Sequence, residues 1–99
     1  MSGRSTEPKL QDIAKALEPF LPPGWSAVVF GSRASGQART GSDWDIGLLG
    51  PMPIGGAVVE KARDALEGLR TLHSFDVVDL ATVPEGFRRQ ALSRIVRLT

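Results

Sequence analysis

The sequence has 99 residues, with 12 Lys and Arg against 11 Asp and Glu and a formal net charge of +1. These values are typical of one small domain and argue against binding of nucleic acid through bulk charge. It has no cysteine and one histidine, which excludes disulfides, zinc–thiolate sites and two-histidine metal sites. No apolar run is long enough to span a membrane and no secretory signal is visible, so we expect a cytoplasmic protein.

Helical and strand patterns alternate along the chain. Apolar residues at helical spacing indicate helices, and short runs rich in Val, Ile and Phe indicate strands. We expect a flexible arm at 1–8 and one domain over 1–99. The predicted elements are a helix at 8–18, a strand at 25–30, a glycine-rich loop at 31–41 with a short helix at 33–35, a strand at 43–49, a helix at 56–72, a strand at 75–80 and a helix that begins near 84.

This order predicts an α+β fold of two layers, in which helices cover one face of a small mixed sheet of three or more strands. The last helix is expected to extend to the end of the chain. Its apolar stripe is predicted to consist of Phe87, Ala91, Ile95 and Leu98. The arginines of this helix lie off the stripe. We interpret them as a solvated face or, alternatively, as a docking surface for an acidic partner or RNA.

Two carboxylates lie close together in the second predicted strand. Residues i and i+2 of a strand point to the same face, so Asp43 and Asp45 are expected side by side, about 7 Å apart. Trp44 and Ile46 then point the other way, into the core. Adjacent like charges repel, and a divalent cation resolves the repulsion. Mg²⁺ commonly binds through one or two carboxylates together with substrate phosphates.

The loop before this strand has the composition of a phosphate site. Gly31 and Ser32 directly follow the first predicted strand. Glycine has no side chain there to keep a ligand from the backbone, and the backbone amides that follow can bind an anion. Arg33 and Arg39 add positive charge to the same loop. A phosphate cradle followed by a pair of carboxylates indicates metal-assisted phosphoryl or nucleotidyl transfer. The loop lacks the Gly-Lys-Ser/Thr ending of a P-loop.

The third predicted strand carries two further candidates, Asp76 and Asp79. Their odd spacing means that only one of them shares a given face of the sheet. If Phe75 and Val77 pack on helices, Asp76 lies on the open face; in the other register, Asp79 does. A third carboxylate beside the first pair would complete a two-metal site and could accept the proton of an attacking hydroxyl.

The chain resembles a known family at these residues. Gly31-Ser32, followed after ten residues by Asp43-x-Asp45, resembles the signature of the nucleotidyltransferase superfamily that includes DNA polymerase β. The fuller string GSRASG…SDWDI is similar to the minimal nucleotidyltransferase (MNT) branch, which contains antitoxins encoded beside HEPN-domain toxins. The segment 75–80 and the order of elements also fit this branch. The resemblance therefore implies a nucleotidyltransferase fold.

The resemblance also implies a set of site residues. Those expected to bind the nucleotide are Gly31, Ser32, Arg33 and Ser42. Those expected to bind two Mg²⁺ ions and to act in catalysis are Asp43, Asp45 and Asp76. Asp76 is preferred to Asp79 because family members typically carry the earlier aspartate of such a strand. Gly47 departs from the family, which usually has an apolar residue there.

The function implied is Mg²⁺-dependent transfer of AMP from ATP to a hydroxyl, such as a tyrosine of a HEPN toxin, by a chain that acts as the antitoxin. The chain has no acceptor-binding domain, so a partner is expected to supply that surface in a homo- or hetero-oligomer. Neither a membrane nor direct nucleic-acid binding is expected. The alternatives are an antitoxin that neutralises its partner by contact alone, with a vestigial site, and a subunit of an enzyme acting on a small hydroxylated substrate.

Overall fold

The computed structural model describes residues 8–38, 43–69, 71 and 73–99, so the predictions for the N-terminal arm, Arg39 and Ser42 lie outside the described residues. The three predicted strands agree with the observed ones to within about one residue at each end, and the structure adds a fourth short strand near the C-terminus. The elements in chain order are α1 (Leu10–Leu17), the 3-10 helix η1 (Glu18–Phe20), β1 (Ser26–Phe30), α2 (Ser32–Ser35), β2 (Trp44–Leu49), α3 (Gly56–Glu67), β3 (Phe75–Asp79), α4 (Glu85–Leu92) and β4 (Val96–Arg97).

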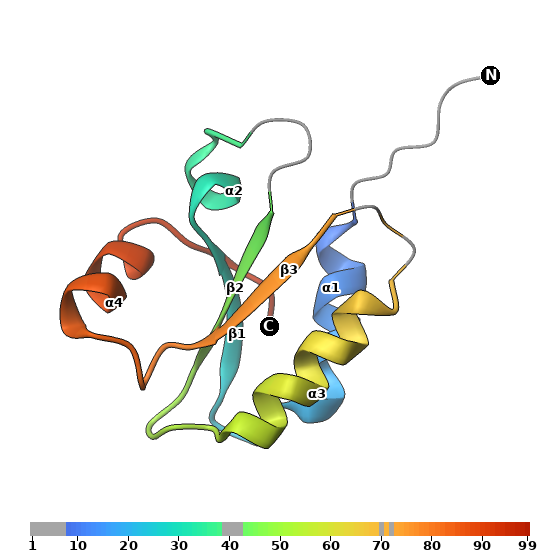
Figure 1. Cartoon of the computed structure of the whole chain (residues 1–99), viewed down its shortest axis with the longest axis horizontal. Coiled ribbons are helices and arrows are strands. Elements are labelled where there is room, and N and C mark those ends of the chain that lie inside the picture. Colours follow the sequence, from blue (N-terminus) through green and yellow to red (C-terminus); the bar gives the residue numbers. More distant parts are fainter. Residues whose placement is uncertain (1–7, 39–42, 70, 72) are drawn as a thin grey trace.

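The strands form one mixed sheet in the order β3-β2-β1-β4. β1 pairs antiparallel with both β2 and β4, whereas β2 and β3 are parallel. A parallel pair needs a crossover connection, and α3 supplies it. The α+β class with a small mixed sheet is therefore confirmed. Figure 1 shows α1 and α3 on one side of the sheet and α4 on the other.

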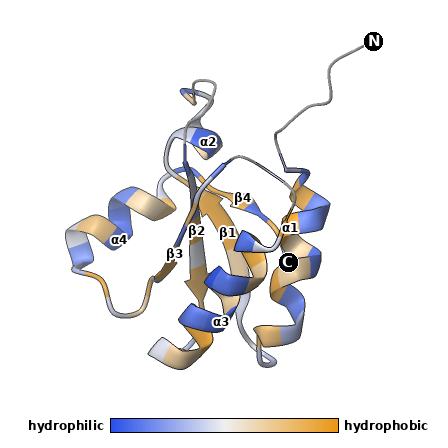
Figure 2. Cartoon of the chain, turned by 45° about the vertical axis from the view of Figure 1, so that its right-hand side comes forward, coloured by the Kyte–Doolittle hydropathy of each residue, from blue (hydrophilic) through white to orange (hydrophobic). Residues whose placement is uncertain are grey.

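The main core lies between the sheet and the pair α1 and α3. The apolar stripe of α1 contributes Ile13 and Leu17, and α3 contributes Ala62 and Leu66, all of them buried. From the sheet, alternate residues of each strand face this layer, as the strand period requires. They are Ala27, Val29, Trp44, Ile46, Leu48, Phe75 and Val77. Apolar strands lie at the centre of Figure 2. The inward orientation predicted for Trp44 and Ile46 is confirmed.

A second, smaller cluster covers part of the opposite face of the sheet. Val28 and Phe30 of β1 pack there with Leu80 and with Ala91 of α4. The ring of Phe30 meets that of Phe87 edge to face, with centroids 6.0 Å apart and an interplanar angle of 83°. The helices are thus not confined to one face as the sequence predicted, because α4 packs over the face opposite to α1 and α3.

The C-terminal segment corrects one prediction. α4 ends at Leu92, and the chain continues into β4, where Val96 pairs with Val29. The stripe predicted for one long helix is therefore broken: Ala91 is buried, but Phe87 and Ile95 are exposed. Val96 and Leu98 instead alternate along an extended chain and pack against the main core. The unpaired edge of β1 gains hydrogen bonds from this strand, which outweighs the helical pattern.

The third helix is shorter than predicted, since it stops at Glu67 and is capped by Gly68, which is a poor helix former. Gly47 does not loosen β2. A Cβ at this position would overlap the buried side chain of Leu80, so glycine makes room for the second cluster. No helix within the described ranges is long and apolar enough to cross a membrane.

Candidate active site

Asp45 and Asp76 are neighbours across the parallel strands β2 and β3, where they are register partners. Neighbouring strands lie about 4.8 Å apart, and both residues point away from the face covered by α1 and α3. Asp45 is half-buried and Asp76 is exposed. Asp43, also exposed, precedes Asp45 by two residues. These carboxylates lie on the same face of the sheet as Phe30, the antiparallel partner of Asp45.

The charges of these carboxylates affect one another. Burial raises the pKa of the Asp45 carboxyl above its usual 3.8, and the negative charges of Asp76 and then of Asp43 raise it further. Desolvation and like charges both disfavour the ionised form. A nearby cation would stabilise the ionised form of this carboxyl, so the local electrostatics favour binding of a positive charge beside Asp45.

Asp79 has a different environment. It lies on the helix-covered face of β3 and is 9% exposed. Its carboxylate accepts hydrogen bonds from the backbone N–H of Ile54 at 2.9 Å and of Ala81 at 3.0 Å. These bonds join the segment before α3 to the turn after β3. Of the two alternatives for the third strand, the structure thus brings Asp76, and not Asp79, beside Asp45.

Gly31 packs closely against the side chain of Asp45. Its φ of 72° lies in the left-handed region, and an added Cβ would collide with the Asp45 carboxylate. Both the backbone conformation and the missing side chain are therefore required for this packing. Ser32 follows as the first residue of α2, so the Gly31-Ser32 pair lies directly against the carboxylate site. Figure 1 shows α2 where β1 ends and β2 begins.

A pocket of about 470 Å³ opens beside this pair. One wall comes from the α2 region and the other from the end of α4. Its lining consists of Gly31, Ser32, Ser35, Gln37, Gln90, Ser93 and Arg94. These residues include no carboxylate and one cation, which is a composition suited to an anionic ligand. Sequence reasoning missed the contribution of α4, because only the fold brings residues 90–94 beside Gly31.

Arg33 does not reach this pocket. Its guanidinium lies over the ring of Trp44, 4.7 Å from the centroid, and Nη2 donates to Nδ1 of His73 at 3.1 Å. Arginine has no acceptor, so Nδ1 of His73 must be the unprotonated ring nitrogen. Trp44 belongs to the opposite face from Asp45. The structure therefore joins Arg33 to the helix-covered layer, and its assignment to nucleotide binding stays a prediction.

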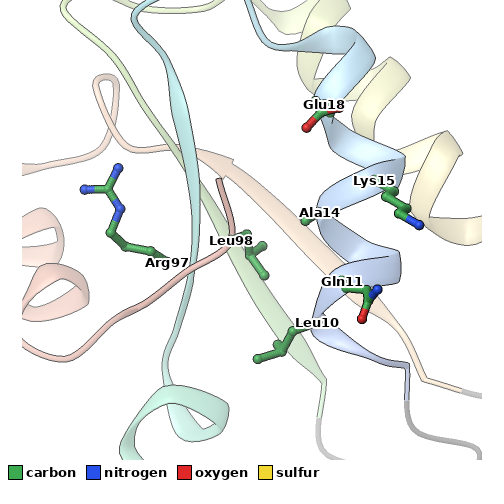
Figure 3. Close-up of a pocket in the computed structure, with 7 residues that line it drawn as sticks. All are labelled: Leu10, Gln11, Ala14, Lys15, Glu18, Arg97 and Leu98. Carbon is green, nitrogen blue, oxygen red and sulfur yellow. The ribbon is translucent and has the colours of Figure 1, made fainter.

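A second hollow, of about 350 Å³, lies between α1 and β4 (Figure 3). Its lining residues are Leu10, Gln11, Ala14, Lys15, Glu18, Arg97 and Leu98. None of the predicted site residues contributes to it. The chemistry-bearing residues of the chain are thus concentrated at the α2 end of β1, β2 and β3.

The fit of a divalent cation follows from the donor set. Within the described part of the chain, no three His, Asp or Glu side chains are gathered closely enough to form a complete metal cage. Mg²⁺ does not require one, because it usually binds through one or two carboxylates and substrate phosphates. Asp45 and Asp76, with Asp43 nearby, provide hard oxygen ligands and a local excess of negative charge. The residues therefore fit Mg²⁺ that arrives with a nucleotide.

Comparison with known proteins identifies the family. The model of the family described as "Polymerase beta, Nucleotidyltransferase" matches residues 24–98, from the turn before β1 to β4. The chain belongs to this nucleotidyltransferase family. The predicted resemblance is thereby confirmed, and the Gly31-Ser32 and Asp43-x-Asp45 motifs lie within the matched segment.

The nucleotidyltransferase is similar to a curated protein of Haemophilus influenzae, "Probable protein adenylyltransferase MntA", with 29% identity over 76 residues, covering 77% of this chain and 67% of the relative. Its fold matches a toxin–antitoxin crystallised with AMP-PNP, with a TM-score of 0.70 and 23% identity, covering 93% of this chain and 73% of the other. It also matches a complex of a tri-AMPylated Shewanella oneidensis HEPN toxin with an MNT antitoxin, with a TM-score of 0.62 and 21% identity, over 91% and 68% of the two chains.

Proposed function

We propose that this nucleotidyltransferase transfers AMP from ATP to a hydroxyl group of a HEPN toxin in the cytoplasm and thereby acts as its antitoxin. The observation that carries the proposal is the juxtaposition of Asp45 and Asp76 beside Gly31-Ser32 on one face of the sheet. Metal ligands next to a phosphate cradle are the arrangement that nucleotidyl transfer requires. The similarity to MntA supports adenylylation, and the MNT–HEPN complex supports the class of partner.

In the proposed reaction, Gly31 and Ser32 hold the triphosphate, and Asp43, Asp45 and Asp76 hold Mg²⁺. The metal, when bound, neutralises phosphate charge and makes the α-phosphorus more electrophilic. The acceptor oxygen forms a bond to that phosphorus, the bond to the bridging oxygen of the β-phosphate breaks, and pyrophosphate leaves. Asp76, the more exposed partner of Asp45, accepts the proton of the acceptor hydroxyl.

The acceptor in this proposal is a tyrosine of the partner. The 99 residues contain no tyrosine, so a tyrosine acceptor has to lie outside them. The carboxylates also leave room for it, because Asp43 and Asp76 are exposed. A partner that covers this face would exclude water from the site and bring its hydroxyl to the nucleotide.

The test combines Asp43→Asn with Asp45→Asn and measures labelling of the cognate toxin by ATP that carries ³²P at the α-position. We expect labelling by the wild type and none by the variant, with no labelling from γ-labelled ATP. The matched control is Asp12→Asn with Asp64→Asn, which removes two exposed carboxylates from α1 and α3 and is expected to retain labelling. Labelling by the site variant at the wild-type rate would overturn the mechanism.

A second readout separates catalysis from binding. Cells that produce the toxin are expected to lose protection when the antitoxin carries Asp43→Asn and Asp45→Asn, although the variant still folds and still binds the toxin in a pull-down. Full protection by this variant would instead indicate that contact alone neutralises the toxin.

A further inference from the structure

The pocket beside Gly31-Ser32 has a second wall that the site motifs do not include. Gln90, Ser93 and Arg94, at the end of α4, line it opposite the residues of α2. α4 packs on the same face of the sheet as Asp45, through Phe30 and Ala91. Residues 31–37 and residues 90–94, which are far apart in the sequence, therefore line one hollow beside Gly31.

Arg94 is the cation of this pocket. The Ser93 hydroxyl donates to the carbonyl oxygen of Gln90 at 2.7 Å, which closes the last turn of α4 directly before Arg94. Among the described residues, the ion pair on this helix joins Arg88 to Glu85 and does not involve Arg94. Arg33, the arginine of the cradle itself, faces Trp44 and His73 instead.

The side chains that line the pocket favour a ligand with phosphate groups. A guanidinium presents up to five N–H donors and binds phosphate groups in a bidentate manner. The other lining residues carry neutral hydroxyl and amide groups, so no carboxylate of the pocket competes with an anionic ligand for Arg94. The Asp45 carboxylate, which packs against Gly31 and is not part of the lining, repels an anion unless a cation intervenes. Negative ligand groups are thus favoured at the Arg94 end of the pocket.

We propose that Arg94 binds the β- and γ-phosphates of the nucleotide and stabilises the pyrophosphate as it leaves. This inference rests on the proposed nucleotidyl transfer and adds to it a binding residue from outside the motif. When the bond between the α-phosphorus and the bridging oxygen breaks, the electron pair stays on pyrophosphate, whose added charge then lies against the Arg94 guanidinium. A group placed where charge develops lowers the barrier of the step.

The test compares Arg94→Gln with Arg89→Gln, which removes the same charge from an exposed position on α4 outside the pocket. Calorimetry with Mg²⁺ measures binding of the α,β-methylene analogue of ATP, which cannot transfer AMP, and of AMP, which lacks the phosphates in question. We expect Arg94→Gln to weaken binding of the analogue by about ten-fold or more and to leave AMP binding within about two-fold. Arg89→Gln should leave both unchanged.

Arg94→Lys gives an independent check, because it keeps the charge and loses the planar fork. It is expected to bind the analogue with an affinity between those of the wild type and Arg94→Gln. Equal binding of the analogue by wild type and Arg94→Gln, while Asp43→Asn with Asp45→Asn abolishes transfer, overturns the role of Arg94 and leaves the proposed function intact. Equal loss of AMP and analogue binding in Arg94→Gln also overturns it. A wild type that binds neither nucleotide contradicts both proposals.

Discussion

Asp45 and Asp76 are register partners on parallel neighbouring strands, and both point to the face that α1 and α3 leave uncovered. Backbone pairing fixes the register of these two residues, so their side chains stay neighbours as long as the sheet is intact. A fold that keeps like charges adjacent is less stable than it would be with one of them neutral. This relationship links the stability of the protein to the cation that its site is expected to bind.

Asp45→Asn is expected to stabilise the protein at neutral pH by about 0.2–1 kcal/mol, because it removes a half-buried charge next to two others. The pKa of Asp45 is raised, so the folded state holds its proton more tightly than the unfolded chain does. The stability from this group is present below the unfolded pKa of 3.8 and is lost as the pH rises through the folded value. The melting temperature of the variant should therefore exceed that of the wild type by a difference that grows as the pH rises. Asp64→Asn serves as the control, and a difference that shrinks over that range would contradict the expectation.

Mg²⁺ together with a non-reactive ATP analogue is expected to raise the melting temperature of the wild type. At a ligand concentration of 100 times Kd, linkage predicts a stabilisation of about 2.7 kcal/mol. The same addition should stabilise Asp43→Asn with Asp45→Asn much less, and EDTA should reverse the wild-type effect. If the double variant gained as much as the wild type, these aspartates would not be the metal ligands.

The sequence was sufficient for the α+β class and for the segment that carries the motif, but it did not place α4 on the face of the sheet opposite to α1 and α3. The inward orientation of Trp44 follows from strand parity, which depends only on local spacing. Parity alone could not choose between Asp76 and Asp79, because the choice depends on which face of β3 meets α3. Packing between elements that are distant in the sequence decides which of the two aspartates lies beside Asp45, and local sequence patterns do not predict that packing.

The C-terminal segment shows a second limit. Phe87, Ala91 and Ile95 have helical spacing, yet the chain leaves the helix after Leu92 to pair with the open edge of β1. These hydrogen bonds are made with β1, about 70 residues earlier in the chain. The spacing of nearby apolar residues therefore cannot predict them. For the same reason the helical pattern alone places Arg94 on a solvated or docking face. Its place in the pocket depends on where α4 ends.

Asp79→Ala and Asp76→Ala are expected to separate structure from catalysis. Asp79→Ala leaves the N–H groups of Ile54 and Ala81 without their charged acceptor, which should cost about 1.5–3 kcal/mol in urea unfolding. Asp76→Ala should leave the free energy of unfolding unchanged or slightly raised, since its side chain is exposed beside Asp45, and it should abolish AMP transfer. The opposite pattern of stability losses would contradict the structural role of Asp79.

Arg33→Gln is expected to destabilise the protein by about 0.5–2 kcal/mol, because it removes the cation–π contact with Trp44 and the hydrogen bond to His73. The control Arg63→Gln removes an exposed i,i+3 pair with Glu60, which is typically worth less than about 0.5 kcal/mol. Chemical denaturation of both variants measures the difference. Equal stability of Arg33→Gln and Arg63→Gln would show that the contacts of Arg33 contribute little.

Gly31→Ala is expected to damage both the fold and the site, since its Cβ would collide with the Asp45 carboxylate. Gly36→Ala is the matched control, because Gly36 also has a positive φ, 82°, but open space around the added Cβ. An alanine with a positive φ should lower the free energy of unfolding of each variant by about 1–2 kcal/mol. Gly31→Ala should lose more stability than this, because of the collision with Asp45. Combining it with Asp45→Ala removes the carboxylate that the Cβ would strike, so the double variant should recover the excess loss in a thermodynamic cycle. Additive losses in that cycle would mean that Gly31 and Asp45 are not in the close contact that joins the phosphate cradle to the carboxylate site.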